Sequence, residues 1–323
     1  MIVISEQEAR ALVSIEDAIE AVEKSFAAMA RGQARNYPVV REVVGYRDAV
    51  FGVKTGCDTA APILGLKAGG YWPHNLGKGL GNHQSSTLLF DPETGRASAL
   101  VSANYLTGVR TGAASAIATK HLSRSDSSVL GIIGAGVQAQ YQLRATLAVR
   151  PIRKVLAWDP SADNLAAFGQ AVQQLGLEFV AATDRQGVAA SADILITVTP
   201  SQKALVEKPW VRPGTHISAM GADTKGKQEL DPQLVAAAAL FVDEAAQAIT
   251  IGECQHAYAA GLINAESFRG SIGEVVAGLR DGRRTAQEIT LFDGTGVALQ
   301  DLVVADLAVR LATQRGVGAA VDY

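Results

Sequence analysis

The sequence predicts an α/β protein built around a Rossmann-type, doubly wound parallel sheet. From about residue 124 onward, short apolar strand patterns alternate with helical patterns, which is typical of βαβ units and a parallel sheet. A Gly-x-Gly-x-x-Ala turn directly follows the first of these strands, and an acidic residue follows the second. The alternation and the turn together indicate a dinucleotide-binding unit.

The segment before this unit has a different rhythm. Ser14 and Asp17 resemble a capping box, and the apolar residues at 15, 19, 22, 26 and 29 share one helical face. Gly32 lies where this helix is expected to end. Strand patterns follow at 39–44, 49–53 and 85–90. Residues 64–80 contain so many Gly, Pro and Asn residues that we expect an irregular segment there.

Beyond residue 124 the elements can be assigned in order. Strands are predicted at 129–133, 155–158, 178–181, 193–198, 216–220 and 240–243, and helices from 137 to about 149, at 161–175 and at 300–314.

The composition excludes several classes of protein. Hydrophobic residues make up 48% and charged residues 19% of the 323 positions, which excludes intrinsic disorder. The net charge is −3 and no basic stripe is visible, so nucleic acid is not an expected partner. No apolar run approaches the ~18 residues of a spanning helix, and the N-terminus lacks a basic secretory segment. The two cysteines are isolated, so we expect a cytoplasmic protein without disulfides or a metal site.

The turn after the strand at 129–133 has the features of a pyrophosphate site. Gly134 permits the tight turn, Gly136 lets backbone N–H groups approach the anion, and Ala139 keeps helix and strand close. Asp159, 25 residues beyond Gly134, would accept hydrogen bonds from the ribose hydroxyls. No Lys or Arg occurs in residues 160–163, which favours NAD(H), with NADP(H) still open. The alternative is a structural turn in which Asp159 only caps a helix.

Three polar, glycine-rich segments carry the candidate chemistry. They are residues 66–84, 107–114 and 220–230, and they contain Lys67, Arg110 and Asp223. Cations in irregular, glycine-rich segments suit the binding of a carboxylate by side chain and backbone together.

The same residues, taken in order, resemble those of a known family. Lys67, the pair Arg110-Thr111, the turn at 134–139, the stretch 221–230 and the Phe-Asp-Gly-Thr-Gly run at 292–296 are together similar to the ornithine cyclodeaminase/μ-crystallin family. The resemblance implies a nicotinamide-linked enzyme of imino and amino acids, usually a homodimer. It also implies a Rossmann domain at 124–298 and an α+β substrate-binding and dimerisation domain made from both chain ends, 1–123 and 299–323.

The resemblance also implies the roles of individual residues. Arg41, Lys67 and Arg110 match positions that hold the substrate carboxylate, and Thr295 matches a substrate-side position. Asp223 matches the catalytic carboxylate. Lys67 is also expected to be catalytic, because by holding the substrate carboxylate it orients the reacting carbon. The positions expected to contact the cofactor are Asn82, Arg110, Thr111, Gly134, Gly136, Val137, Gln138, Asp159, Thr199, Met220, Gly221, Asp223, Lys227 and Gly294.

Two departures from the family pattern bear on the substrate. Asn82 stands where the family usually has Thr or Ser. Lys54 stands, by a gap-free count from Lys67, where the cyclodeaminases have a Glu that holds a distal ammonium. A lysine repels an ammonium and attracts a carboxylate, so the pocket suits a doubly acidic substrate. Several stretches are most similar to members that reduce iminosuccinate, the imine of oxaloacetate, to aspartate.

Other interpretations remain open. Within the family they are an ornithine cyclodeaminase, a cyclic ketimine (pyrroline-2-carboxylate) reductase and an alanine-dehydrogenase-like enzyme. A non-catalytic ligand-binding protein, as μ-crystallin suggests, is a fourth, although μ-crystallin lacks the carboxylate that matches Asp223. Lys54 could equally be a solvated lysine, and Arg41 could pair with Glu42. For the Glu253-Cys254-Gln255-His256 run, helix packing is favoured over metal binding.

Overall fold

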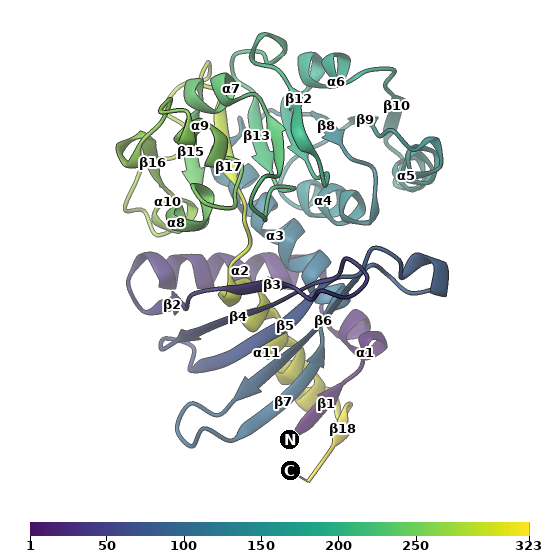
Figure 1. The fold of residues 1–323 in the computed structure, drawn as a ribbon, viewed down its shortest axis with the longest axis vertical. Coiled ribbons are helices and arrows are strands. Elements are labelled where there is room, and N and C mark those ends of the chain that lie inside the picture. Colours follow the sequence, from purple (N-terminus) through teal and green to yellow (C-terminus); the bar gives the residue numbers. More distant parts are fainter. Residues whose placement is uncertain (323) are drawn as a thin grey trace. The chain divides into compact units, whose positions relative to one another are not determined.

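The computed structural model describes residues 1–322, which form two compact units (Figure 1). Among the described residues, the first unit comprises 1–110 and 297–322, and the second comprises 111–296. Helix α3 (Asn104–Leu122) begins in the first unit and ends in the second. The domain boundaries proposed from the sequence, after residues 123 and 298, stay predictions.

The first unit is an eight-stranded sheet with helices. Its elements are β1 (Ile2–Ile4), α1 (Glu6–Leu12), α2 (Ile15–Ala30), β2 (Ala34–Asn36), β3 (Val40–Val43), β4 (Val50–Asp58), β5 (Ile63–Tyr71), the short 3₁₀ helix η1 (Leu76–Lys78), β6 (His83–Phe90), β7 (Ala97–Ser102), α11 (Ala298–Arg315) and β18 (Ala319–Ala320). The strand order is β18-β1-β7-β6-β5-β4-β2, and β3 also pairs with β4.

The helix predicted near the N-terminus is confirmed as α2. The hydroxyl of Ser14 accepts a hydrogen bond from the backbone N–H of Asp17 at 3.1 Å and donates one to its carboxylate at 2.6 Å. Gly32 follows the helix with a φ of 70°, a left-handed conformation that glycine adopts without strain. The buried face of α2 packs against α11, and α11 in turn packs on strands β4, β5 and β6.

The irregular segment predicted at residues 64–80 is wrong over its first half, because residues 63–71 form strand β5. The glycines there provide close packing and not a loop. A Cβ atom added at Gly65 would lie 2.6 Å from the backbone oxygen of Leu88 and 3.1 Å from the side chain of Leu302 on α11. Glycine is therefore what lets α11 approach the sheet at this point.

The second unit has the predicted βαβ alternation. Its elements are β8 (Val129–Ile133), α4 (Val137–Leu147), β9 (Lys154–Trp158), α5 (Ala162–Gln174), β10 (Glu178–Ala181), α6 (Arg185–Ser191), β11 (Ile194–Thr197), β12 (Gln202–Val206), η2 (Lys208–Trp210), β13 (His216–Ala219), β14 (Gln228–Leu230), α7 (Pro232–Ala237), β15 (Ala239–Val242), α8 (Ala245–Ala248), α9 (Gln255–Ala259), η3 (Ala265–Ser267), β16 (Phe268–Ser271), α10 (Ile272–Val276) and β17 (Thr290–Asp293).

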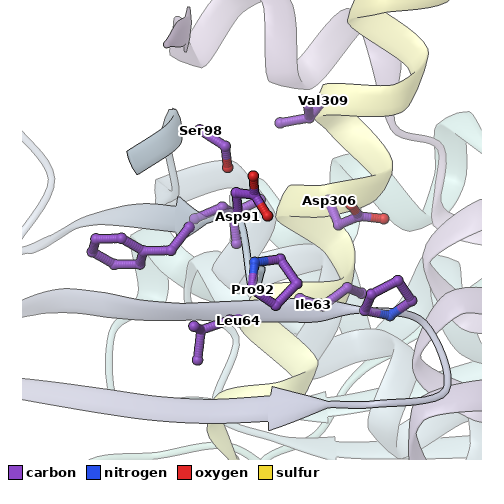
Figure 2. Close-up of a pocket in the computed structure, with 10 residues that line it drawn as sticks. Ile63, Leu64, Asp91, Pro92, Ser98, Asp306 and Val309 are labelled. Carbon is purple, nitrogen blue, oxygen red and sulfur yellow. The ribbon is translucent and has the colours of Figure 1, made fainter. Parts of the chain in front are cut away.

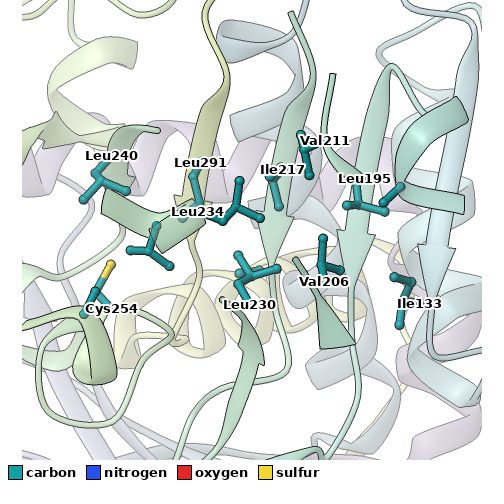
Figure 3. Close-up of a cluster of buried hydrophobic side chains, with 14 of the residues drawn as sticks. Ile133, Leu195, Val206, Val211, Ile217, Leu230, Leu234, Leu240, Cys254 and Leu291 are labelled. Atoms are coloured by element: carbon teal, nitrogen blue, oxygen red, sulfur yellow. The ribbon is translucent and has the colours of Figure 1, made fainter. Parts of the chain in front are cut away.

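Eight of these strands form one parallel sheet in the order β10-β9-β8-β11-β13-β17-β15-β16, which confirms the doubly wound α/β fold. The order reverses between β8 and β11, and ligands of such sheets bind at the carboxyl ends of the strands beside that reversal. Figure 3 shows part of the core, in which Leu195, Ile217 and Leu291 of adjacent strands lie beside Leu230 and Leu234. Among the helices of residues 1–322, none is long and apolar enough to cross a membrane.

Candidate active site

The first unit places three of the predicted cations around one buried carboxylate. Lys54 and Lys67 lie directly opposite each other on β4 and β5, and Arg110 comes from α3. The Oδ1 atom of Asp301, on α11, accepts hydrogen bonds from Lys67 Nζ at 3.2 Å and from Arg110 Nε at 2.9 Å. The side chains of Lys67, Arg110 and Asp301 are all at least nine-tenths buried. Arg110 therefore lies in a helix and Lys67 in a strand, which corrects the prediction that both occupy irregular segments.

The neighbouring residue, Gln300, belongs to the same cluster. Its Oε1 accepts a hydrogen bond from Arg110 Nη1 at 2.9 Å. Its Nε2 and the Oδ2 of Asp301 are buried without a hydrogen-bond partner among residues 1–322. Buried polar atoms are usually paired, so a free donor and a free acceptor beside three cations are what a polar ligand would satisfy. Nothing in the sequence patterns singled out Gln300 or Asp301.

The charges of this cluster shift one another's titration. Burial lowers the pKa of Lys67 to about 7; Asp301 opposes this effect, whereas Arg110 and Lys54 add to it. Burial alone would raise the pKa of Asp301, but the charges of Arg110, Lys67 and Lys54 hold that pKa below its ordinary value. The cluster thus has more positive than negative groups, and an anion would stabilise the protonated form of Lys67.

Two further predicted residues also lie in the first unit. Arg41 is half-buried on β3, paired in register with Gly52, two residues before Lys54 on β4. The side chain of Asn82 forms hydrogen bonds to neighbouring residues of the same segment. Its Nδ2 donates to the Tyr71 hydroxyl at 3.2 Å, and its Oδ1 accepts from the N–H of Leu76 at 3.2 Å. A pocket in this unit (Figure 2) is lined by Pro62, Ile63, Leu64, Leu89, Phe90, Asp91, Pro92, Ser98, Asp306 and Val309, so it contains none of the predicted site residues.

In the second unit, the Gly134–Ala139 turn fits a dinucleotide phosphate. Gly134 has a φ of 99°, and an added Cβ would lie 2.8 Å from the backbone oxygen of Val198, so this position requires glycine. An added Cβ at Gly136 would meet nothing within 4 Å, and α4 begins there without a side-chain cap. Its first N–H groups are therefore available to an anion. Val137 is 78% exposed, and the Oε1 of Gln138 is buried without a hydrogen-bond partner within residues 1–322.

The carboxylate of Asp159 spans the turn and the following helix. Oδ2 accepts a hydrogen bond from the N–H of Ala135 at 2.7 Å, and Oδ1 accepts one from the N–H of Ser161 at 2.8 Å. These bonds fix the side chain at the end of β9, beside the glycine turn. A carboxylate oxygen has lone pairs for more than one donor, so the same atoms can also accept from ribose hydroxyls.

The candidate catalytic carboxylate, Asp223, follows β13. Its Oδ1 accepts hydrogen bonds from Lys227 Nζ at 2.7 Å and from the Thr224 hydroxyl at 3.1 Å. Lys227 also donates to the backbone oxygen of Gly221 at 3.2 Å. Asp223 keeps about a third of its side chain exposed, so it is both oriented by a cation and open to a ligand.

The other predicted residues of this unit are buried or packed into its loops. The backbone N–H of Gly294 donates to the oxygen of Ala219 at 3.0 Å, and an added Cβ there would lie 2.6 Å from the sulfur of Met220. The hydroxyl of Thr295 donates to Asp243 at 2.7 Å. Thr111 is buried in α3. Within residues 1–322, no three His, Cys, Asp or Glu side chains are grouped as metal ligands would be.

Comparison with known proteins identifies relatives of the whole chain. The model of the ornithine cyclodeaminase/mu-crystallin family matches residues 1–313. The iminosuccinate reductase of Paracoccus denitrificans is 51% identical, with full coverage of both chains. Its crystal structure in complex with NAD⁺ superposes with a TM-score of 0.95, 50% identity and coverage of 100% and 99%.

Two further relatives have other activities. The alanine dehydrogenase of Archaeoglobus fulgidus is 38% identical over 100% of this chain and 98% of its own. The Δ¹-pyrroline-2-carboxylate reductase of Thermococcus litoralis, in complex with NADH and L-proline, superposes with a TM-score of 0.96 at 34% identity and covers 99% and 100% of the two chains.

The role of Asp301 can be tested by replacing it with Asn. The variant leaves Lys67 and Arg110 buried without that carboxylate, and we expect the free energy of unfolding to fall by about 3–5 kcal/mol. Urea unfolding followed by circular dichroism measures this loss. Asp306→Asn is the matched control, because Asp306 lies on the same helix but pairs with Arg310 near the surface, and it should cost less than about 1 kcal/mol. Equal losses in the two variants would contradict a special role for Asp301.

Proposed function

Because the chain belongs to the ornithine cyclodeaminase/mu-crystallin family, we propose that it is an NAD(H)-dependent imine reductase that converts iminosuccinate to aspartate. The observation that carries the proposal is the cation cluster of the first unit, in which Lys54, Lys67 and Arg110 surround the carboxylate of Asp301. The full-length similarity to the Paracoccus denitrificans iminosuccinate reductase supports the same substrate.

The balance of charges in the cluster suits two carboxylates. Lys67 and Arg110 share Asp301, so they retain donors for one substrate carboxylate. Lys54, opposite Lys67 on the next strand, supplies a further cation for a second carboxylate, and Arg41 lies close by in register. A substrate with a distal ammonium, such as ornithine, would meet like charge at Lys54. The dicarboxylate is therefore the better match.

The second unit would hold the cofactor. The pyrophosphate would lie at the N-terminus of α4, with Gly134 and Gly136 beneath it, and the ribose hydroxyls would donate to Asp159. The related structures in complex with NAD⁺ and NADH support NAD(H) as the cofactor. When bound, NADH supplies the hydride that adds to C2 of the imine.

The protein's own residues would supply orientation and the proton. Lys67 and Arg110 hold the α-carboxylate, which fixes C2 and makes the transfer effectively intramolecular. The imine nitrogen gains one proton as C2 gains the hydride, and the C=N double bond becomes a C–N single bond. Asp223 hydrogen-bonds this nitrogen and relays the proton, while Lys227 orients the carboxylate.

We further propose that the chain forms a homodimer through the face of the first sheet that is turned away from α11. Leu66, Leu88 and Leu100 form a row on β5, β6 and β7, in direct register, and all three are partly exposed. An apolar row across three strands suits a second copy of the same sheet. The archaeal alanine dehydrogenase that superposes with a TM-score of 0.95 is described as a dimer.

The dimer can be tested by placing a charged side chain in this apolar row. Leu88→Asp places a carboxylate at its centre, and we expect sedimentation to show a species of half the wild-type mass. Gln170→Asp, at an exposed position of α5 in the second unit, is the control and should leave the mass unchanged. A monomeric wild type, or a Leu88→Asp protein that stays dimeric, would contradict this interface.

The activity is tested by following NADH oxidation at 340 nm. We expect faster turnover with oxaloacetate plus ammonium than with pyruvate or glyoxylate plus ammonium, and none of this excess when ammonium is omitted. Asp223→Asn should lower kcat by about 10²–10⁴-fold because proton transfer is lost, while NADH affinity changes little. Asp281→Asn, an exposed control, should match the wild type. Unchanged kcat in Asp223→Asn would exclude its proposed role, and NADH binding without consumption of any imine would favour a binding protein.

The choice of a dicarboxylate is tested at Lys54. Lys54→Ala removes one charged contact, so we expect kcat/KM for iminosuccinate to fall by about 10- to 100-fold. The imine of pyruvate lacks the distal carboxylate, and its kcat/KM should change much less. Lys24→Ala, at an exposed position of α2, is the matched control. Equal losses of kcat/KM with both imines would show that Lys54 does not bind the distal carboxylate.

A further inference from the structure

The carboxylate of Glu229 joins the ends of two neighbouring strands in the second unit. Glu229 lies on β14 and is fully buried. Its Oε1 accepts a hydrogen bond from the backbone N–H of Thr199 at 2.6 Å, and its Oε2 accepts one from the N–H of Gly221 at 2.9 Å. The hydroxyl of Thr197 donates to the same Oε2 at 2.8 Å. Each oxygen thus has a backbone N–H of its own.

The two N–H groups belong to loops at one edge of the sheet. Thr199 follows β11 and Gly221 follows β13, which are adjacent and parallel, so both loops lie at carboxyl ends of strands. The packing around Glu229 has no spare room. A Cβ atom added at Gly221 would collide with the backbone oxygen of Thr199 and lie 2.5 Å from the carboxyl carbon of Glu229. Glu229 therefore fills the space between the two loops and bonds to both.

A second layer holds Glu229 in turn. The Oε1 of Glu253 accepts hydrogen bonds from the backbone N–H groups of Glu229 at 3.0 Å and Leu230 at 2.6 Å. Gln255 accepts from the N–H of Gly226 at 2.7 Å. Its neighbour, His256, forms a 3.1 Å hydrogen bond through Nε2 with the backbone oxygen of residue 227. The Glu253–His256 run thus braces the whole stretch 226–230.

Glu229 and Glu253 are two buried acids whose hydrogen bonds differ. Burial raises the pKa of both, and the pKa of Glu253 rises well above its ordinary value because the charge of Glu229 adds to the effect of burial. Glu229 accepts hydrogen bonds from three donor groups, which favour its ionised form, whereas Glu253 accepts from two, because the N–H of Glu229 is shared between both of its oxygens. The hydrogen bonds therefore favour the ionised form of Glu229 more than that of Glu253.

We propose that Glu229 is a positioning residue: its carboxylate fixes the distance between the Thr199 and Gly221 loops and thereby the seat of the nicotinamide half of NAD(H), with Glu253 as its brace. The inference rests on the proposed function, in which Asp159 at the end of β9 takes a ribose of the cofactor. Strands β11 and β13 lie on the other side of β8, so their loops, with the expected cofactor positions Thr199 and Gly221, would hold the nicotinamide half. It predicts that an ionised side chain with two acceptor atoms is needed at 229, and that a single acceptor is enough at 253.

The test compares isosteric substitutions by two ligands. Glu229→Gln has one acceptor oxygen, so its amide N–H₂ must face a backbone N–H, and we expect NADH affinity, measured by nicotinamide fluorescence, to fall by about 10- to 100-fold. ADP-ribose lacks the nicotinamide, and its affinity by calorimetry should stay within about twofold of the wild type. Glu253→Gln can turn its oxygen to both N–H groups and should retain both affinities. The exposed Glu207→Gln is the matched control.

The outcomes separate positioning from a general loss of structure. Equal losses of NADH and ADP-ribose in Glu229→Gln, or unchanged NADH affinity, would overturn the proposal. If Glu229→Gln does not fold, Gly221→Ala forces the same loops apart without changing a polar group, and it should show the same selective loss of NADH. Because the readout is binding and not turnover, a chain that binds NADH but reduces no imine would refute the proposed function and leave this test intact.

Discussion

The carboxylate of Asp301 lies between two buried cations, Lys67 and Arg110, and this contact allows a strand and a helix to carry positive charge into the interior of the first unit. A buried ammonium without a partner would lose its proton or destabilise the fold. Even with Asp301 present, burial and the charges of Arg110 and Lys54 lower the pKa of Lys67 to about 7, so an anion would stabilise its protonated form. The packing of α11 on β5 and the capacity of the site for an anion thus have the same origin.

A similar arrangement recurs in the second unit. Glu229 is buried and is not expected to contact a ligand. It nevertheless connects the loops of Thr199 and Gly221, which are expected to contact the cofactor. In both units a buried carboxylate, Asp301 or Glu229, hydrogen-bonds to groups that are expected to contact a ligand. The surroundings of Glu229 leave little room for a change of size, since a Cβ atom added at Gly221 would lie 2.5 Å from its carboxyl carbon.

The sequence predicted six of the eight strands of the second unit's sheet, because these are short apolar runs, and it predicted the pyrophosphate turn from its glycine spacing. Strands β16 and β17 were not predicted. Strand β5 was missed, since glycine content is ordinarily a sign of a loop, whereas here Gly65 makes room for α11. Helix α3 was missed for a related reason, because Gly108 and Gly112 obscure its pattern. Asp301 and Glu229 could not be recognised as site residues, since their roles depend on partners 191 or 30 positions away that only folding brings together.

The separation between residues that hold the substrate and residues that support them explains how one fold could serve several substrates. Alanine, proline and iminosuccinate, after which the relatives are named or with which they are bound, share a carboxylate beside the reacting carbon and differ at the distal end. Under the proposed function, Lys67 and Arg110 hold the shared carboxylate, and Asp301 ties them to the core. Lys54 lies on the neighbouring strand and is half-buried. Its replacement would change the distal charge without breaking the Asp301 contacts, so specificity can vary at position 54 while the support for catalysis is kept.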